Sequence, residues 1–569
     1  MGARAATWRT RQQFREAEGV LLVLRDPPPP SPPAAGQPPT VPANPAEGQE
    51  ILLAFADDGY AVALAGHVDL GTGLQTAYAQ LVAEELGLPL SQVTVILGDT
   101  ARVPNQGPTI ASASIQIHSM PLRLAAAQAR RWLCDEAARI FGVAPESVAI
   151  GDGHASASDG RRVALGLFVA SRHVELLLDA GTPLKPVSEH RIVGTSAARV
   201  DIPAKVAGDA VYVHDVRVPG MLHGRVIRPP YAGIDAGDFV GRTLLHVDES
   251  SIAHLAGVRK VVVIGDFVGV VAEREDEAEA AMHALRVQWK PWPALPPLDD
   301  LAQAIRANPA TPRVVSTQGD VDAARATCVT PIDREYVWPY QLHASIGPSC
   351  AVADWREELA PSLRSAPPPP EGAAPPRGGP SAATLTVWGG TQNPHVLRAD
   401  IARLMGLADT AVEVVRLEAS GCYGRNGADD VAADAALLSR AAGAPVRVQL
   451  TREQEHAWEP KGTAQLMQVR GGLDADGAPA AYDFQTSYPS NAAPTLALLL
   501  TRTIEPVGRT FEMGDRTAVP PYAYANQRIT VNDMAPILRA SWLRGVSALP
   551  NSFAHESYID ELASAAQVD

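Results

Sequence analysis

Residues 66–116, GHVDLGTGLQTAYAQLVAEELGLPLSQVTVILGDTARVPNQGPTIASASIQ, contain a glycine-rich turn, a helix and a strand in close succession. Apolar side chains recur at helical spacing from position 74 to position 86, and Gly87 is placed to end that helix. Alternating apolar residues at 93–97 then predict a strand. Because loosely alternating strands are also expected at 51–66, the unit reads strand, glycine turn, helix, strand.

The turn at residues 69–76 (DLGTGLQT) has the chemistry to hold a phosphate or another anionic group. Glycine allows close backbone approach, Thr72 and Thr76 offer hydroxyls, and the following helix should present unpaired N–H groups and a positive dipole end. Short glycine motifs match by chance often, so an ordinary strand-to-helix turn is the alternative. The turn is neither a Walker A loop nor a GxGxxG fingerprint.

Residues 109–116 (TIASASIQ) form an unusual run of small and hydroxylated side chains. Small hydroxylated residues are typical of turns, where their side chains bond the nearby backbone. We therefore interpret this run as a tightly packed turn, with ligand binding as the alternative.

Residues 421–427 (GCYGRNG) repeat the first arrangement, because they follow a strand expected at 412–417 and precede a helix expected at 429–442. Asp429 and Asp430 fall in the first turn of that helix, where carboxylates are stabilised by the dipole. We therefore expect them to act as caps and not as catalysts. Cys422 is expected to be a small packed residue, because nothing in the sequence demonstrates the electropositive neighbours that a reactive thiol needs.

Further segments surround these turns. A second, alanine-rich helix is expected at 121–141, and residues 193–292 are rich in Val and Ile with regularly spaced turns, which predicts a small α+β domain. From about residue 333 onward, strands alternate with a helix, as in α/β packing. The proline-rich stretches 27–45 and 361–380 hold few large apolar residues and are expected to be mobile. The second lies between two strand-like runs, so it is either a long hairpin loop or a domain boundary.

The whole chain has 569 residues, of which 46% are hydrophobic and 20% charged, as expected for a large globular multidomain protein. A net charge of −15 without a block of Lys and Arg argues against a nucleic-acid partner. The four cysteines lie far apart with no CxxC pair, so no metal is expected to be held by thiolates; they are Cys134, Cys328, Cys350 and Cys422.

The N-terminal region lacks the features of an export signal or a membrane span. The apolar run at 20–24 is too short for either, and the basic residues near position 10 are not a twin-arginine pair. We expect a cytoplasmic protein, with export beside a signal-bearing partner as the alternative.

Three separate segments resemble one family. Residues 66–116 resemble the cofactor-binding segment of the xanthine dehydrogenase and aldehyde oxidase family. Residues 194–223 look like the start of that family's a/b hammerhead domain, and residues 391–394 (TQNP) with 421–462 look like its first molybdopterin-binding domain. The branch with the large subunits of isoquinoline 1-oxidoreductase and nicotinate dehydrogenase is the most similar in motif sequence and order. The resemblance covers about residues 51–562.

This resemblance implies a mixed α/β, α+β fold with several domains, typical of a molybdenum hydroxylase large subunit. The expected order is a proline-rich tail (1–50), a molybdopterin-binding segment (51–190), an a/b hammerhead domain (191–295), a linker (296–330) and a first molybdopterin-binding domain (331–569) with a disordered insertion (361–382). A further C-terminal domain is expected beyond residue 569.

The family holds molybdenum through the dithiolene of a pterin, so the protein is expected to provide hydrogen bonds and shape instead of metal ligands. Two turns are expected to cradle one pterin, and Gln341 matches the glutamine that lies beside the oxo group on the metal. Arg544 matches an arginine that binds near substrate or cofactor. The implied residues of the two turns are Gly71, Thr72, Gly73 and Thr76 in the first and Gly421, Cys422, Tyr423, Gly424 and Arg425 in the second.

Some positions depart from the family pattern or have a second explanation. Thr72 replaces the glutamine of a Gly-Gln-Gly turn, and about Gly427 stands where many members place a substrate-orienting carboxylate, which argues against purine-type recognition. Ser547 replaces a glycine and is expected to alter that turn. His343 accompanies Gln341, but an interior structural histidine is an equal alternative. Glu556 is expected to be structural.

The chemistry implied by the resemblance is hydroxylation of an N-heterocycle or an aldehyde with oxygen from water. Electrons would pass to [2Fe-2S] clusters on a small partner subunit, with a cytochrome c as a further candidate acceptor. The general-base glutamate of this family lies in a Gly-x-Gly-Glu segment that is expected beyond residue 569, so no catalytic residue is assigned here. The nucleotide form of the pterin is open, with the cytosine dinucleotide as one candidate. The competing hypothesis is a cofactor-binding fragment or scaffold remnant without turnover.

Overall fold

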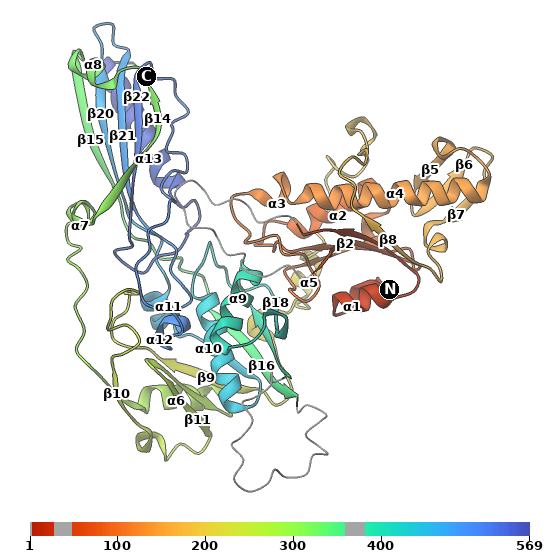
Figure 1. The fold of residues 1–569 in the computed structure, drawn as a ribbon, viewed down its shortest axis with the longest axis horizontal. Helices are drawn as coiled ribbons and strands as arrows, with labels where there is room; N and C mark the ends of the chain where they lie inside the picture. Colours follow the sequence, from red (N-terminus) through yellow and green to blue (C-terminus); the bar gives the residue numbers. More distant parts are fainter. Residues whose placement is uncertain (1–2, 28–47, 359–381, 569) are drawn as a thin grey trace, which may run out of the picture. The chain divides into compact units, whose positions relative to one another are not determined.

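The computed structural model describes residues 3–27, 48–358 and 382–568, and these divide into two compact units. Unit 1 comprises residues up to 218 together with the segment 351–419, and unit 2 comprises residues 219–350 and 420–568. Each unit is described by itself below (Figure 1). Two expectations from the sequence, the mobility of most of 27–45 and of 361–380, lie outside the described residues.

Unit 1 contains a five-stranded sheet, three further paired strands and a small three-stranded β-meander. Its strands are β1 (Val20–Arg25), β2 (Glu50–Ala56), β3 (Ala61–Ala65), β4 (Val93–Leu97), β5 (Val148–Gly151), β6 (His154–Ala157), β7 (Arg162–Ala164), β8 (His173–Leu177), β16 (Cys350–Glu358), β17 (Ala382–Gly389) and β18 (Val412–Arg416). Its helices are α1 (Arg11–Glu16), α2 (Leu74–Leu86), α3 (Ala113–Gln116), α4 (Ser119–Phe141), α5 (Ile202–Ala207) and α9 (Pro394–Met405). The elements expected at 51–66, 74–86, 93–97 and 121–141 are confirmed.

The main sheet of unit 1 has the order β4-β3-β2-β1-β8. In the run VLLVL of β1, Leu21 and Val23 join the core under α2 and α4, whereas Val20, Leu22 and Leu24 join the core on the face of α1. Both faces are covered, so every residue of the run is apolar. The expectation of a proline-rich tail over residues 1–50 is wrong for residues 20–25, because these form an interior strand.

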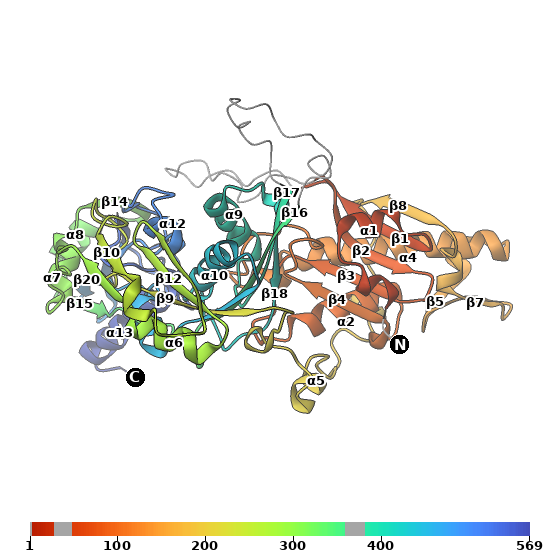
Figure 2. The same ribbon diagram turned by 90° about the horizontal axis from the view of Figure 1, so that it is seen from below.

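Helices α2 and α4 cover one face of this sheet and α1 covers the other, as Figures 1 and 2 show. Both long helices end on a glycine in the left-handed region, Gly87 after α2 and Gly142 after α4. Glycine adopts this conformation without strain, so these two residues set where the helices end. The join to the next segment is made by Glu84 of α2, whose carboxylate accepts the backbone amides of residues 191–193.

The remaining strands of unit 1 are β16, β17 and β18, with α9 between β17 and β18 in the chain. β16 pairs antiparallel with β17, and Glu358 lies opposite Ala382. β17 then pairs parallel with β18. The hairpin interpretation of the second proline-rich stretch is therefore confirmed for the strands that flank it.

Unit 2 contains two larger sheets and a two-stranded ribbon. Its strands are β9 (Leu222–Ile227), β10 (Leu244–Asp248), β11 (Val258–Ile264), β12 (Phe267–Ala272), β13 (Arg286–Trp289), β14 (Ala310–Gln318), β15 (Thr330–Trp338), β19 (Val446–Gln449), β20 (Gln465–Leu473), β21 (Pro479–Pro489) and β22 (Gln527–Met534). Its helices are α6 (Glu275–Ala284), α7 (Leu301–Ala307), α8 (Val321–Ala326), α10 (Ala428–Ala442), α11 (Arg452–Trp458), α12 (Leu496–Leu500) and α13 (Ala548–Ala566).

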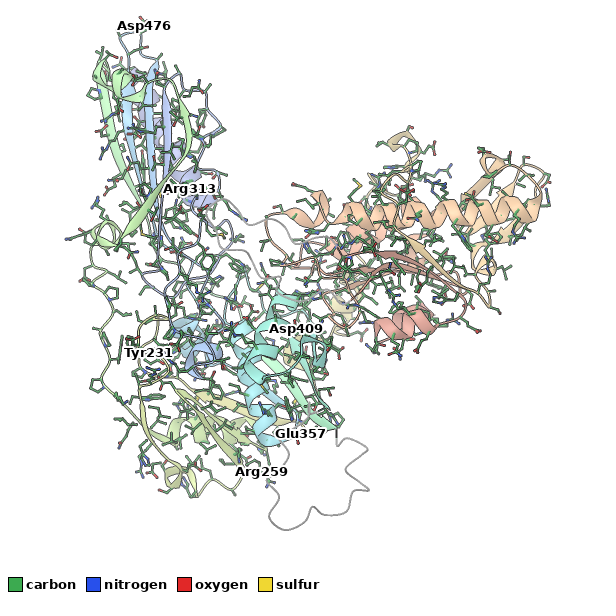
Figure 3. The ribbon with its side chains drawn as sticks, viewed as in Figure 1. Tyr231, Arg259, Arg313, Glu357, Asp409 and Asp476 are labelled. Carbon is green, nitrogen blue, oxygen red and sulfur yellow. The ribbon has the colours of Figure 1, made fainter. Side chains whose placement is uncertain are left out.

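One part of unit 2 places β12 between β11 and β9, and β9 pairs parallel with β19. Helix α6 packs on this sheet, and β10 pairs with β13. The α+β composition expected for residues 193–292 is present from residue 219 onward, whereas residues 193–218 belong to unit 1. Tyr231, labelled in Figure 3, donates its buried hydroxyl to Asp266, which also accepts the amide and hydroxyl of Thr243.

The other sheet of unit 2 has the order β14-β22-β21-β20-β15, and α13 lies along it (Figure 1). Arg313 of β14, labelled in Figure 3, pairs with Asp533 of the neighbouring β22 at 3.0 Å. The expectation of a linker over 296–330 is therefore wrong, because β14 is a full member of the sheet and α7 and α8 flank it. Sheet pairing is non-local, so the sequence around 310–318 carries little sign of it.

The mixed α/β fold class is confirmed by both units. The two units are discontinuous in sequence, so they do not follow the linear domain boundaries expected from the resemblance, and those boundaries stay predictions. Among the described residues, no helix is long and apolar enough to cross a membrane.

Candidate functional site

The glycine-rich turn of unit 1 is closed by its own carboxylate. Asp69 is buried, and its Oδ1 atom accepts the amides of Gly71, Thr72 and Gly73 at 2.9, 2.9 and 3.2 Å. Its Oδ2 atom accepts the amide of Gln75 at 3.1 Å. The expectation of unpaired N–H groups is therefore wrong for these four amides, of which only that of Gln75 belongs to helix α2 itself.

Two further contacts hold this turn. The amide of Val200 donates to the Thr76 hydroxyl at 3.0 Å, and the Arg199 guanidinium donates to the Gly71 carbonyl at 3.0 Å. Arg199 is itself paired with Asp201 at 2.6 Å. What the turn leaves open is its outer edge at Gly71 and Thr72, which is exposed to solvent. Its binding role, expected for Gly71, Thr72, Gly73 and Thr76, stays a prediction.

Residues 109–116 lie beside this turn and are tied to it by side chains. The Thr109 hydroxyl accepts the amide of Val68 at 3.0 Å, and the Ser114 hydroxyl lies 2.6 Å from Nδ1 of His67. The side chain of Gln392, from the TQNP segment, donates to the carbonyl of Thr109 at 3.0 Å. The packed-turn interpretation agrees with these contacts, although residues 110–112 are themselves exposed.

The second glycine-rich loop, in unit 2, is held by a distant segment of the chain. Residues 423–425 run antiparallel to residues 542–544, and we call their backbone contacts the clamp. The clamp consists of the Arg425 amide on the Trp542 carbonyl at 3.0 Å, the Arg544 amide on the Tyr423 carbonyl at 2.6 Å, and the bridge between Gly424 and Leu543. A Cβ on Gly424 would lie 1.9 Å from the Trp542 carbonyl oxygen. The close approach therefore requires glycine.

Arg425 turns its side chain into the interior of unit 2. Its guanidinium pairs with Asp429 at 2.9 Å and donates to the Thr495 hydroxyl at 2.9 Å. Asp430 pairs with the fully buried Arg539 at 3.0 Å. Both carboxylates of the α10 first turn are thus bound to arginines and serve structure. Cys422 is buried too, so any contact of Cys422 or Arg425 with a ligand stays a prediction.

Gln341 and Arg544 line one small pocket of unit 2 that is open to solvent. The backbone of Gln341 is fixed by two hydrogen bonds with Gly462, at 3.1 and 2.9 Å. The Arg544 guanidinium lies 5.9 Å from the centre of the Tyr423 ring, which is 42% exposed. Among the described residues, no carboxylate pairs with Arg544. The other lining residues are Trp338, Gly462, Thr463, Tyr488, Leu543, Val546 and Leu549.

A cluster of polar side chains lies next to the clamp and consists of His343, Glu459 and Lys461. Of these residues, only His343 was singled out from the sequence. Nε2 of His343 lies 3.1 Å from the Trp542 carbonyl oxygen, and Nδ1 lies 3.9 Å from Oε2 of Glu459. Burial lowers the pKa of His343 to about 4. Burial, together with the Glu455 carboxylate, raises the pKa of Glu459, and burial lowers the pKa of Lys461. Nothing in the local sequence around 458–462 (WEPKG) signals that these groups are buried.

Unit 2 offers a donor set that fits a pterin with anionic oxygens. Gln341 brings an amide to the pocket, Arg544 brings a cation without a carboxylate partner among the described residues, and Tyr423 brings an exposed ring. The turn of unit 1 fits less well, because Asp69 already occupies four of its amides. No group of three or more His, Cys, Asp or Glu side chains suited to a metal ion occurs among the described residues.

Comparison with known proteins gives two family matches and several relatives. Two family models, each described as a molybdopterin cofactor-binding domain, match residues 33–200 and 379–569. A nicotinate dehydrogenase subunit of Pseudomonas putida is 58% identical over 98% of this chain and 45% of its own length. The β-subunit of isoquinoline 1-oxidoreductase of Brevundimonas diminuta is 27% identical over 93% of this chain and 70% of its own.

A solved structure of quinoline 2-oxidoreductase from Pseudomonas putida 86 superposes with a TM-score of 0.49 at 17% identity, covering 66% of this chain and 49% of that one. The chain spans less than half the length of the nicotinate dehydrogenase relative. Both family matches fall on the segments that carry the glycine-rich turns, so the resemblance inferred from the sequence is confirmed. The chain belongs to the xanthine dehydrogenase and aldehyde oxidase family of molybdopterin-binding subunits.

Proposed function

We propose that this chain is the molybdopterin-binding part of an oxidoreductase that hydroxylates an N-heterocyclic substrate, with nicotinate as the first candidate. The observation that carries the proposal is 58% identity to the nicotinate dehydrogenase relative over 98% of this chain. Water would supply the oxygen. An aldehyde substrate is the second candidate, because the family includes aldehyde oxidoreductases.

The residues proposed to meet the cofactor are Gln341 and Arg544, which line the pocket of unit 2, and Tyr423, whose ring contacts Arg544. Gln341 would orient the group through its amide, and Arg544 would bind an anionic oxygen. When bound, a molybdenum pterin supplies the two-electron acceptor and the place where the oxygen is transferred. We propose that the first turn contributes its exposed edge at Gly71 and Thr72 to cofactor binding.

The proposed reaction releases two electrons, which must pass from the cofactor to a further acceptor before the next turnover. We therefore propose a small partner subunit with [2Fe-2S] clusters, and a cytochrome c as a further acceptor. The cytosine dinucleotide is the proposed form of the pterin. Release of CMP on acid hydrolysis of the cofactor-loaded chain would test this form. A cytoplasmic location is proposed as well. Cell fractionation tests it, and recovery of the chain outside the cytoplasm would favour export beside a signal-bearing partner.

Metal analysis of the full chain, produced in a host that makes the cofactor, tests cofactor binding. We expect molybdenum to copurify with the chain, and Arg544→Gln to lower the retained amount by about tenfold. Arg131→Gln removes an exposed arginine of α4 as the matched control and should leave the molybdenum content unchanged. A folded chain without molybdenum would overturn the proposal.

Coexpression with the partner tests the substrate. Reduction of a dye by the assembled complex should proceed with nicotinate and be slower with isoquinoline and with an aldehyde. If the complex turns over only the aldehyde, an aldehyde replaces the N-heterocycle as the proposed substrate.

A further inference from the structure

We propose that Glu459 and His343 share one proton and act as positioning residues for the clamp, so that a proton on Glu459 holds Tyr423 and Arg544 in register. The importance of that register rests on the proposed function, because the clamp carries two of the residues assigned to the cofactor. The geometry of the pair stands independently of it.

The partner of His343 fixes which ring nitrogen carries the proton. Nε2 lies 3.1 Å from the backbone carbonyl oxygen of Trp542, and a carbonyl only accepts hydrogen bonds. Nε2 is therefore protonated. In a neutral ring Nδ1 is then an acceptor, and it is buried without a hydrogen-bond partner among the described residues. The nearest carboxylate atom, Oε2 of Glu459, is buried and unpartnered in the same way.

Two acceptors that face each other at 3.9 Å in the buried interior repel, and a single proton between them removes the repulsion. Burial opposes charge on either group, so a neutral carboxylic acid beside a neutral imidazole is favoured over a carboxylate beside an imidazolium. The distance of 3.9 Å between Nδ1 and Oε2 is longer than a hydrogen bond. A rotation of the Glu459 side chain that moves Oε2 by about 1 Å toward Nδ1 brings the two atoms within hydrogen-bond distance.

The proton on Glu459 controls the clamp through the Trp542 carbonyl. That oxygen accepts both Nε2–H of His343 and the amide of Arg425. If Glu459 ionises, the ring gains a better partner at Nδ1 and its proton moves there from Nε2. The lone pair of Nε2 then faces the Trp542 carbonyl at about 3 Å, and the clamp loses a hydrogen bond and gains a repulsion.

Charged groups from several elements face this pair and set where it titrates. Glu455 on α11 opposes ionisation of Glu459, and Lys461, which follows α11, favours it. Asp430 on α10 acts on Glu455, and Arg539 acts on Lys461. Lys461, and to a lesser extent Arg425 in the loop, oppose a positive charge on His343.

Nitrogen NMR of the full chain labelled with ¹⁵N-histidine tests the tautomer, with His343→Gln used to assign the signal. Between about pH 6 and about pH 9 we expect His343 to change from the Nε2–H to the Nδ1–H tautomer without becoming an imidazolium. An imidazolium at neutral pH, or one tautomer throughout, would overturn the proposal. This measurement needs no folded variant of Glu459.

Hydrogen exchange tests the effect on the clamp. Gln at position 459 keeps a neutral donor toward Nδ1 at every pH, so in Glu459→Gln the protection of residues 421–427 and 541–546 should not depend on pH. The unmodified chain should lose about tenfold in protection as pH rises, the size of one net hydrogen bond. Glu453→Gln makes the same change at an exposed position of α11 and should follow the unmodified chain.

If Glu459→Gln loses protection with pH as the unmodified chain does, Glu459 is not the controlling group. Neither readout involves molybdenum, so a chain that binds no cofactor can still pass both tests, and a loaded chain can fail them.

Discussion

The two glycine-rich turns of this protein look alike in sequence and are held in different ways. In unit 1, Asp69 closes the turn at 69–76 with a carboxylate that lies within six residues of every amide it binds. In unit 2, the loop at 421–427 is held by residues 542–544, more than a hundred positions away. The first turn is a local cap, whereas the second is a tertiary contact.

This difference decides which groups each turn can offer to a ligand. Asp69 accepts four amides of the first turn, so these four are not available to an anion. The second loop keeps its backbone paired too, but it presents the exposed ring of Tyr423 beside Arg544 at an open pocket. A glycine-rich pattern before a helix therefore does not by itself predict free backbone donors.

Replacing one glycine in each turn by alanine should give the largest difference in unfolding free energy between the two turns. In Gly424→Ala the new Cβ would lie 1.9 Å from the Trp542 carbonyl oxygen, so we expect the unfolding free energy to fall by more than about 3 kcal/mol. In Gly71→Ala the Cβ meets no atom within 4 Å, so only the strain of its positive φ, about 1–2 kcal/mol, should appear. Urea unfolding measures both. Equal losses of unfolding free energy in the two variants would show that Gly424 does not closely approach the Trp542 carbonyl.

Two carboxyl groups, Glu84 in unit 1 and Glu459 in unit 2, should make pH-dependent contributions to stability of opposite sign. Burial raises the pKa of Glu84. The hydrogen bonds from Lys185 and from the amides of residues 191–193 outweigh this effect and lower the pKa to about 2. A folded-state pKa below the unfolded value of 4.5 stabilises the fold above that value, and the stabilisation is lost as pH falls toward 2. The raised pKa of Glu459 has the opposite sign, since it makes the fold less stable as pH rises above 4.5.

Urea unfolding of Glu84→Gln at several pH values checks this. At about pH 6 we expect a loss of about 2 kcal/mol, the size of hydrogen bonds to a charged group, and in strong acid the variant and the unmodified chain should converge. A loss that does not change with pH would mean that the carboxylate charge plays no part.

A smaller effect is expected from Asp69→Asn, which keeps one oxygen and loses the other. The amide of Gln75 then faces an NH₂ group, so the unfolding free energy should fall by about 1 kcal/mol. Asp135→Asn changes an exposed residue of α4 in the same way and serves as the control, with a change within about 0.5 kcal/mol. If Asp69→Asn matches this control, the turn is not held by its cap.

The smallest change in stability is expected for Arg544→Gln. Its side chain is exposed and contacts the ring of Tyr423, and such a contact at an exposed site is worth about 0.5–1 kcal/mol. Thermal unfolding should therefore hardly change. A large drop in the melting temperature would show that Arg544 serves folding, as Arg425 does.

The helices were predictable because their signals are local. The apolar spacing of α2, α4 and α10 is regular, and each helix ends on a glycine with positive φ. The strand β1 was missed, because its run of five apolar residues has no alternation when both faces are covered. The strand β14 was missed as well, since most of its residues are exposed or half-buried and its pairing partner lies two hundred residues away.

The candidate site was predictable in part. Gln341 and Arg544 were singled out by resemblance alone, and the fold brings both to one pocket. The roles of Arg425, Asp429 and Asp430 inside unit 2 depend on Thr495 and Arg539, which are distant in sequence. Glu459 was missed because its unusual protonation comes from burial, which no neighbouring residue reveals.

The sequence by itself determined the family, the fold class and the positions of the two glycine-rich turns, because helix ends and turns depend on residues within one or two turns of each other. Only the tertiary structure decided how the second loop is held and which buried acid has a raised pKa. Those outcomes depend on the dielectric surroundings and on partners far along the chain, such as Trp542 for His343.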